Sequence, residues 1–331
     1  MIGRIFGISI IMFGAGTVAG AADQDKAKLT WTDPNRAAAE DPDFSIQGEY
    51  GVAKKKQAWG VQVVALGGGQ FDAYLLEDGL PGLGWHRKKG RLKLSGSRQG
   101  DIVQLVTADG SVSATVKDGR IAVRRSDKRI TDLPRVTRKS PTLGAKPPEG
   151  AVVLFDGQSA DAWINGRVEY GLLPNSDITT KQKFGDYTLH LEFRTPYKPY
   201  ARGQQRGNSG VYHQGRYETQ VLDSFGLEGR QNECGGIYSI ADSRINMCFP
   251  PLTWQTYDVD FTAARFNNSG KLKRPARMTV RLNGVLIHEK QELPKTTTAA
   301  PVKQITPDPG PIFIQHHGNP VYYRNIWIVP K

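Results

Sequence analysis

Short runs of alternating apolar and polar residues recur along the chain and predict β-strands. The clearest is residues 187–194, where every odd position is apolar and every even position is polar. This period of two is typical of a strand with one buried face. Similar runs at 256–261, 278–287 and 322–329 make the second half of the chain β-rich. No segment of useful length shows the period of a helix, so we expect an all-β protein.

The first half of the chain has the pattern of short strands joined by glycine turns. Between residues 102 and 123, β-branched runs are separated by Asp109-Gly110 and Asp118-Gly119, and Asp-Gly between such runs predicts a tight hairpin. Asn283-Gly284 predicts a type I′ hairpin in the second half. The run 67–69 is Gly-Gly-Gly, but no lysine-serine pair and no helix start follows it. We therefore expect a turn there and not a phosphate-binding loop.

Length and proline content divide the chain into parts. A chain of 331 residues suggests two domains. Residues 22–45 are polar and predict an extended lead-in, and residues 46–136 predict a small β-rich domain. Residues 137–150 hold several prolines and no periodicity, which is typical of a linker. Residues 151–331 then suit a two-sheet jelly-roll sandwich.

The first 21 residues have the pattern of a secretory signal peptide. Arg4 is the only charged side chain before Asp23, an apolar run follows it, and Ala19-Gly20-Ala21 provides small residues for cleavage. The apolar run is shorter than the ~20 residues that a membrane span needs. We expect an exported chain that starts near Ala22, without a stable membrane span, in the periplasm or outside the cell.

The net charge of +12 raises the question of nucleic-acid binding. The excess of basic residues is spread over both halves, and acidic residues are interleaved throughout. The pattern favours non-specific attraction to an anionic polysaccharide or membrane surface over nucleic-acid binding. Only two cysteines are present, Cys234 and Cys248, which excludes a four-cysteine zinc site. Their separation suits a disulfide in an exported chain, and two buried thiols are the alternative.

Strand alternation gathers several polar residues that could carry chemistry. Glu218 and Gln220 share one face of a predicted strand, and Gln315 and His317 share one face of another. If these strands are neighbours, the four side chains line one polar site, which Arg324 could join. A carboxylate, an imidazole and amides on one face suit acid–base work on a sugar. The alternatives are a Glu218 held by Arg216 or Arg324, and a merely packed histidine; His316 would point to the opposite face from His317.

Taken together, these segments resemble the 3-keto-disaccharide hydrolase domain family over about residues 150–330. The resemblance rests on the order and spacing of many pieces. They are Val153–Gly157 (VLFDG) with Trp163, Gly207–Tyr212 (GNSGVY), Gly215–Ser224 (GRYETQVLDS), Gly235–Tyr238 (GGIY), Trp254–Asp258 (WQTYD), Leu282–Gly284 (LNG), Gln315–Pro320 (QHHGNP) and Tyr323–Trp327 (YRNIW). His316 stands where the family more commonly has an acidic residue. The insert at 197–206 is basic and aromatic, and we expect a rim loop for an acidic or extended sugar, or a solvated loop.

The resemblance implies a concanavalin-like sandwich that acts on glycosides oxidised at C3 of the sugar. Glu218 would then be the base and His317 the acid, while Gln220, Gln315 and Arg324 would orient the sugar or stabilise an enolate. Asn208, Tyr212 and Asp223 complete the predicted substrate-binding set. No cofactor is required by the sequence, but a divalent metal on Glu218, Asp223 or His317 fits the same chemistry. A non-catalytic carbohydrate-binding module and an envelope-associated interaction protein remain as alternatives.

Overall fold

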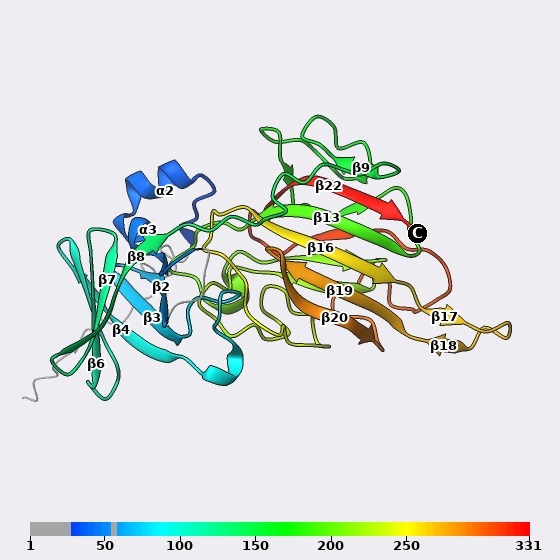
Figure 1. Ribbon diagram of the computed structural model, residues 1–331. Coiled ribbons are helices and arrows are strands. Elements are labelled where there is room, and N and C mark those ends of the chain that lie inside the picture. Colours follow the sequence, from blue (N-terminus) through cyan, green and yellow to red (C-terminus); the bar gives the residue numbers. More distant parts are fainter. Residues whose placement is uncertain (1–27, 54–57) are drawn as a thin grey trace, which may run out of the picture.

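The computed structural model describes residues 28–53 and 58–331, and it places two β domains side by side (Figure 1). The predicted signal peptide, residues 1–21, lies outside the described residues. Within the described ranges, no helix combines the length and the apolar character that crossing a membrane would take. The chain is nearly all β, as the alternation of apolar and polar residues predicts.

The first domain is a closed barrel of eight antiparallel strands in sequential order. Side chains alternate between the packed interior and the solvent, as in β6, where every second residue is buried. Its strands are β1 (Gly48–Tyr50), β2 (Trp59–Gly67), β3 (Gln70–Glu77), β4 (Leu92–Gln99), β5 (Ile102–Val106), β6 (Val112–Lys117), β7 (Arg120–Arg125) and β8 (Lys128–Val136). A short 3-10 helix, η1 (Arg87–Lys89), lies between β3 and β4.

The predicted hairpins of this domain are confirmed. Asp109-Gly110 joins β5 to β6, and Asp118-Gly119 joins β6 to β7 with both residues at positive φ. The three glycines 67–69 form the turn between β2 and β3, and all have positive φ. This conformation favours glycine because it has no Cβ. The three glycines therefore serve to form a tight turn between the two strands.

The lead-in is helical where we expected an extended segment. It forms α2 (Pro34–Glu40) and α3 (Pro42–Ile46). In each helix a proline occupies the first turn and the preceding aspartate caps it: Asp33 accepts a hydrogen bond from the Arg36 N–H, and Asp41 from the Asp43 N–H. The two Asp-Pro pairs of the lead-in are therefore helix starts.

The second domain is a sandwich of two antiparallel sheets with a continuous apolar core between them. The five-stranded sheet contains β10 (Trp163–Ile164), β12 (Ile178–Thr180), β21 (Phe313–His316), β14 (Ser209–His213) and β15 (Tyr217–Val221), in that order. The seven-stranded sheet contains β11 (Leu173–Pro174), β22 (Tyr322–Pro330), β13 (Tyr187–Arg194), β16 (Gln255–Thr262), β19 (Ala276–Leu282) and β20 (Val285–Leu293), with β9 (Val152–Phe155) beside β22. A hairpin of β17 (Arg265–Phe266) and β18 (Leu272–Arg274) extends from it. The predicted Asn283-Gly284 turn joins β19 to β20.

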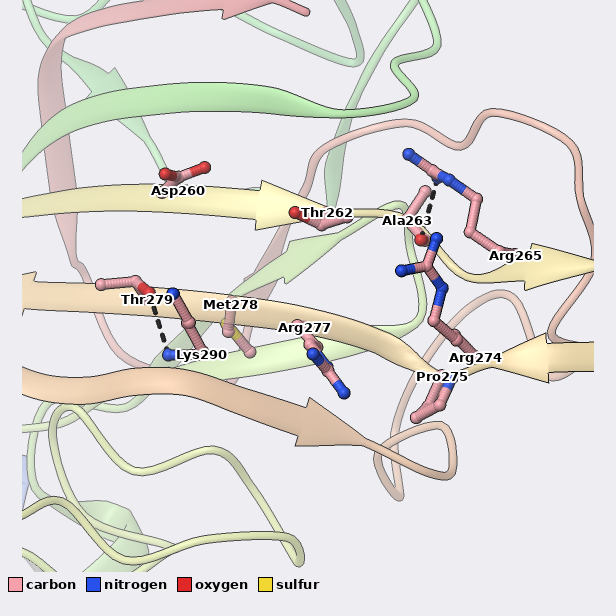
Figure 2. Close-up of a pocket in the computed structure, with 10 residues that line it drawn as sticks. All are labelled: Asp260, Thr262, Ala263, Arg265, Arg274, Pro275, Arg277, Met278, Thr279 and Lys290. Atoms are coloured by element: carbon pink, nitrogen blue, oxygen red, sulfur yellow. Dashed lines mark hydrogen bonds between the residues drawn. The ribbon is translucent and has the colours of Figure 1, made fainter.

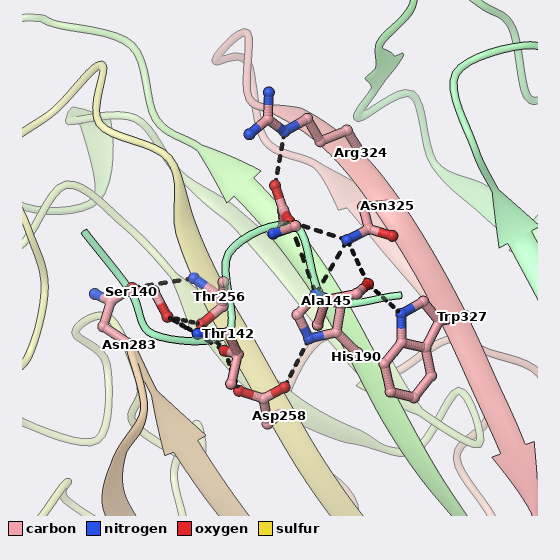
Figure 3. Close-up of polar contacts among 12 residues, drawn as sticks. Ser140, Thr142, Ala145, His190, Thr256, Asp258, Asn283, Arg324, Asn325 and Trp327 are labelled. Atoms are coloured by element: carbon pink, nitrogen blue, oxygen red, sulfur yellow. Dashed lines mark hydrogen bonds and ion pairs between the residues drawn. The ribbon is translucent and has the colours of Figure 1, made fainter. Parts of the chain in front are cut away.

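The proline-rich segment between the domains is bound to the outer face of the seven-stranded sheet (Figure 3). The Ser140 hydroxyl pairs with that of Thr256 at 2.6 Å, and the Thr142 hydroxyl donates to Asp258 at 2.7 Å. The Gly144 N–H donates to the Glu192 carboxylate. We call residues 140–145 the strap. The segment therefore packs as part of the sandwich, although its composition resembles that of a flexible linker.

Cys234 and Cys248 are buried free thiols, so the expected disulfide is absent. The Cys234 Sγ lies 3.4 Å from the Tyr257 hydroxyl, and the Cys248 Sγ lies 3.4 Å from the Phe249 carbonyl oxygen. Burial and the neighbouring Cys234 raise the pKa of the Cys248 thiol. The pair fills core space in the sandwich, as in the alternative of two buried thiols.

Candidate functional site

The predicted polar residues of β14, β15 and β21 do share one face. Gly210 of β14 is in register with Gln220 on one side and Gln315 on the other. Two residues further along, Tyr212 is in register with Glu218, and its ring packs on Phe313 at 5.3 Å. The intervening residues, such as Val211 and Ile314, point into the sandwich core. The grouping of Glu218, Gln220 and Gln315 is therefore confirmed, and we call this surface the Glu218 face.

Glu218 is a buried carboxyl group, with only 3% of its surface exposed. Burial raises its pKa to about 7, and the nearby Tyr212 hydroxyl acts in the opposite direction. Within the described part of the chain, no Lys or Arg forms an ion pair with it. The alternative in which Arg216 or Arg324 holds Glu218 is wrong: Arg216 instead donates to Gln304, Gln214, Thr306 and Asp308. A carboxyl group with this pKa can both take and return a proton near neutral pH.

Gly210 leaves the room that the Glu218 carboxylate occupies. A Cβ at Gly210 would lie 2.4 Å from the Glu218 Oε1 and 2.9 Å from the Tyr212 ring. Any side chain here would therefore displace the carboxylate or the ring. The glycine of the Asn-Ser-Gly motif thus has a steric function in the site.

Among the described residues, two buried polar atoms on the Glu218 face lack a hydrogen bond of good geometry. They are the Oδ1 of Asn208 and the hydroxyl of Tyr212, which lies beside the Glu218 carboxylate and interacts with it. Buried polar groups are almost always hydrogen-bonded, and unpaired ones require an explanation. A ligand with several hydroxyl groups, such as a sugar, would satisfy both atoms. Gln315 and Phe313 of the same face are only half-buried, so the face meets solvent beside them.

His317 lies just beyond the end of β21 and is exposed. Its carbonyl oxygen accepts a hydrogen bond from Asn319 at 2.8 Å. The neighbouring His316 is fixed, with its Nδ1 2.9 Å from the Asn175 carbonyl oxygen and its N–H donating to Asp177. His317 is the histidine that stays free to approach a ligand, and its role as an acid remains a prediction.

Asp223 does not belong to the Glu218 face. It follows the end of β15, where its carboxylate pairs with the Arg206 guanidinium at 2.7 Å and accepts from the Phe225 N–H. Burial raises its pKa, and Arg206 opposes this shift. Arg206 also donates to the Ala65 carbonyl oxygen and to Gln47 in the barrel domain. The Asp223 carboxylate is therefore used in the contact between the domains, and its role in substrate binding stays a prediction.

Arg324 lies on the other sheet. It belongs to β22, where its Nε donates to Glu192 at 2.7 Å (Figure 3). Its guanidinium also stacks over Trp254 at 4.0 Å. The core side chains of the sandwich separate it from the Glu218 face. The expected grouping of Arg324 with Gln220 and Gln315 is wrong, since strand parity does not say which sheet a strand joins.

Gln204 is a residue of the Glu218 face that the sequence pattern did not indicate. It lies in the 3-10 helix η2 (Gly203–Gln205), within the basic and aromatic insert. Its Oε1 accepts hydrogen bonds from Asn208 and Gln220, both at 3.0 Å. The sequence feature that could have indicated Gln204 is its position four residues before Asn208, the first residue of the Asn-Ser-Gly motif.

The insert, residues 197–206, is held by the barrel domain and is not a solvated loop. Tyr197 pairs with Trp31 through both backbone groups, and its hydroxyl donates to Asp41 at 3.0 Å. Arg202 donates to the Leu66 carbonyl oxygen at 2.8 Å, and Tyr200 packs against Gly67. The barrel therefore supports the segment that places Gln204.

Lys198 lies in the same segment and has a buried amine. Its Nζ donates to the Asn319 Oδ1 at 2.8 Å, and burial lowers its pKa. Asn319 also accepts from the Gly207 N–H. This contact joins the insert to the chain that carries His317.

The described residues contain no group of three or more His, Cys, Asp and Glu side chains that could hold a metal ion. Of the three expected ligands, Asp223 is already paired with Arg206. A divalent metal on Glu218 or His317 remains a prediction.

Residues 150–329 match the model of the 3-keto-alpha-glucoside-1,2-lyase-like domain. A crystal structure of an inferred glycosyl hydrolase from Parabacteroides distasonis ATCC 8503 is 34% identical, with a TM-score of 0.51, over 56% of this chain and 85% of that chain. A second inferred glycosyl hydrolase from the same organism is 21% identical, with a TM-score of 0.42, over 55% and 94%. A comparison with curated proteins gives no match. The family match covers more than half of the chain and confirms the resemblance seen in its motifs, so the chain belongs to the 3-keto-alpha-glucoside-1,2-lyase-like domain family.

Proposed function

We propose that the sandwich cleaves 3-keto-glycosides by elimination followed by addition of water, with Glu218 as the base. The family and the similar crystal structure support a glycoside-processing role. The observation that carries the finer proposal is a buried carboxyl group with a pKa near 7, on a face with unpaired polar atoms. A group with this pKa is half ionised at neutral pH, which suits proton transfer.

The first step removes the proton at C2 of the sugar. A ketone at C3 makes this proton acidic, because the negative charge spreads onto the C3 oxygen as an enolate. The Glu218 carboxylate takes the proton and becomes neutral, which its buried surroundings favour. The cost of burying a charged Glu218 is thus relieved as the step proceeds.

The second step breaks the bond between C1 and the leaving group. The enolate electrons form a C1=C2 double bond, the C3 ketone is restored, and the leaving oxygen takes a proton. His317 is the proposed donor of that proton, and the Tyr212 hydroxyl is the competing donor on the same face. Water then adds its oxygen at C1 and passes one proton to the donor that lost it, while Glu218 returns its proton to C2, so the sum is hydrolysis.

The amides of the face hold the sugar in this scheme. Asn208, Gln220 and Gln315 offer both donors and acceptors, and Gln204 fixes two of them. A donor placed at the C3 oxygen would stabilise the enolate as charge develops there. The proposal also includes export of the chain, which determination of the mature protein's N-terminus would test.

The test is incubation of the purified protein with a 3-keto-glucoside and with its unoxidised parent, each with and without a chelator or added divalent metal. We expect release of the leaving group from the keto substrate alone. Appearance of a conjugated enone before water adds would identify elimination. Release from both substrates would point to ordinary glycoside hydrolysis, and retained sugar binding without release would favour a carbohydrate-binding module.

A further inference from the structure

A cationic groove lies on the seven-stranded sheet, where the β17–β18 hairpin meets β16, β19 and β20 (Figure 2). Its volume of about 320 Å³ is within the range of small-molecule sites. Four basic side chains line it, Arg265, Arg274, Arg277 and Lys290, against one acidic side chain, Asp260. None of these residues belongs to the sheet that carries Glu218, so the groove is separate from that site.

Two of the arginines lie directly opposite each other. Arg265 of β17 is in register with Arg274 of β18. Like charges at opposed positions of an antiparallel pair destabilise it. Asp186 pairs with Arg265, which leaves the Arg274 charge uncompensated. An anion in the groove would relieve the repulsion between the two guanidinium groups.

Lys290 reaches the groove through an irregularity in β20. His288 is opposite Val280 and Gln291 is opposite Met278, so two residues of β20 face the single Thr279 of β19. Lys290 is one of the two. Its φ of 45° is a backbone conformation that residues other than glycine rarely adopt. Its N–H donates to the Thr279 hydroxyl at 2.9 Å. Such bulges redirect a side chain and occur often beside functional sites.

The remaining charges of the groove are largely paired. Asp260 pairs with Lys331, and Arg277 pairs with Glu292. Across the residues that the structure describes, the side chains of Arg274 and Lys290 have no hydrogen bond or ion pair. Both are exposed. The groove therefore presents two free cations on a framework that neighbouring ion pairs hold in place.

We propose that the cationic groove binds a carboxylate or sulfate group of an anionic polysaccharide. Guanidinium groups match such oxyanions with two parallel hydrogen bonds, and an ammonium adds a third donor. The choice of a polysaccharide rests on the proposed function, because a second binding site on a glycoside-processing domain would keep a polymer close to the Glu218 face. The charge complementarity itself does not depend on that function.

The test compares two double variants of the full chain. Arg274→Ala with Lys290→Ala removes the free cations of the groove. Lys117→Ala with Lys128→Ala removes the same charge from exposed positions of the barrel and is the matched control. The probes are polygalacturonate, dextran sulfate and neutral dextran, titrated at one fixed ionic strength. We expect the groove variant to bind at least one of the two anionic polymers about tenfold more weakly, the control to bind as the wild type does, and neutral dextran not to bind.

Three outcomes would overturn the proposal. They are no binding of either anionic polymer by the wild type, equal losses in both variants, and tighter groove-dependent binding of phosphatidylglycerol vesicles than of the polymers. Cleavage of a small neutral 3-keto-glucoside, measured on the same samples, should be unchanged in the groove variant. If the wild type shows no cleavage, the proposed function fails while the binding result still decides the proposal about the groove.

Discussion

The two sheets of the sandwich each carry a buried glutamate, and the two carboxyl groups have opposite pKa shifts. Burial raises the pKa of Glu218 to about 7. Burial also acts on Glu192, yet the nearby His190 imidazole and hydrogen bonds from Asn325, Gly144 and Arg324 hold its pKa at about 2. Glu192 is thus charged at neutral pH and fully supplied with donors.

The difference in pKa indicates that Glu192 has a structural role and that Glu218 is a candidate for a chemical role. Glu192 joins β13, β22 and the strap, so its charge is stabilised by groups that must be in place for the domain to fold. Glu218 has the Tyr212 hydroxyl and a glycine beside it, and no basic side chain among the described residues compensates its charge. A strongly perturbed carboxyl group without a structural partner is a candidate for function. Replacing each glutamate in turn tests this contrast.

The largest effect is expected for Glu218→Gln. Loss of the base should lower kcat on a 3-keto-glucoside by about a thousandfold, with the fold unchanged by circular dichroism. In the wild type, kcat/KM should rise with pH through about 7, as the carboxylate forms. Full activity in the variant would rule out Glu218 as the base.

The same variant has a predicted effect on stability. The pKa of Glu218 is about 7 in the folded state and 4.5 in the unfolded state. The contribution of Glu218 to the free energy of unfolding is therefore most favourable below pH 4.5, and it is lost as pH rises through about 7. At pH 8 the variant should be more stable than the wild type, by roughly 3 kcal/mol at most. Urea unfolding at pH 5 and pH 8 measures the difference, which should appear at pH 8.

Glu192→Gln should have the converse phenotype. The folded pKa is lowered, so the charge of Glu192 stabilises the fold above pH 4.5, and this contribution is lost as pH falls toward 2. Its replacement should destabilise the protein at pH 7 by about 2–3 kcal/mol, because Arg324 is left without its partner. The kcat of the folded variant at 25 °C should match the wild type. A large loss of kcat without loss of stability would contradict the assigned structural role.

Gly210→Ala should reduce activity more than stability. The added Cβ would lie 2.4 Å from the Glu218 Oε1, so the carboxylate must move. A misplaced base of this kind costs about a hundredfold in kcat. Gly185→Ala, at a glycine without a positive φ where an added Cβ would meet nothing within 4 Å, controls for a generic glycine effect. The result to look for is a kcat loss confined to Gly210→Ala.

The smallest effect is expected for Gln204→Ala. It leaves the amides of Asn208 and Gln220 without their shared acceptor. We expect KM to rise by about tenfold with a smaller change in kcat, since the sugar-binding amides lose one uncharged hydrogen-bond partner each. Gln205→Ala, at the exposed neighbouring glutamine, is the matched control and should leave both constants unchanged. Equal effects in the two variants would mean that the insert has only a structural role.

The sequence predicts the parts of this site that depend on local order. Alternation along single strands is local, so Glu218, Gln220 and Gln315 are placed correctly on one face. The assignment of strands to sheets depends on contacts between distant segments, and the error for Arg324 arises there. The family resemblance supplies the chemistry, which the strand pattern alone does not reveal.

Contacts between the domains explain why the sequence did not predict another residue of the site. Gln204 reaches the site because the barrel holds the insert, and no pattern within the insert itself predicts that contact. The lead-in helices are a different case. Asp33-Pro34 and Asp41-Pro42 each combine a capping residue with a favoured first residue of a helix, so the sequence contains the helix signal although its polar composition predicts an extended segment.

The strap has a consequence for how this protein can be divided. The family match begins at residue 150, yet Gly144 donates to Glu192 and Ala145 accepts from Asn325 and Trp327. A fragment cut at residue 150 would carry the whole recognised domain and still expose the charged surface that the strap covers. A fragment that keeps this surface covered therefore has to start near residue 139, some ten residues before the region that sequence comparison recognises.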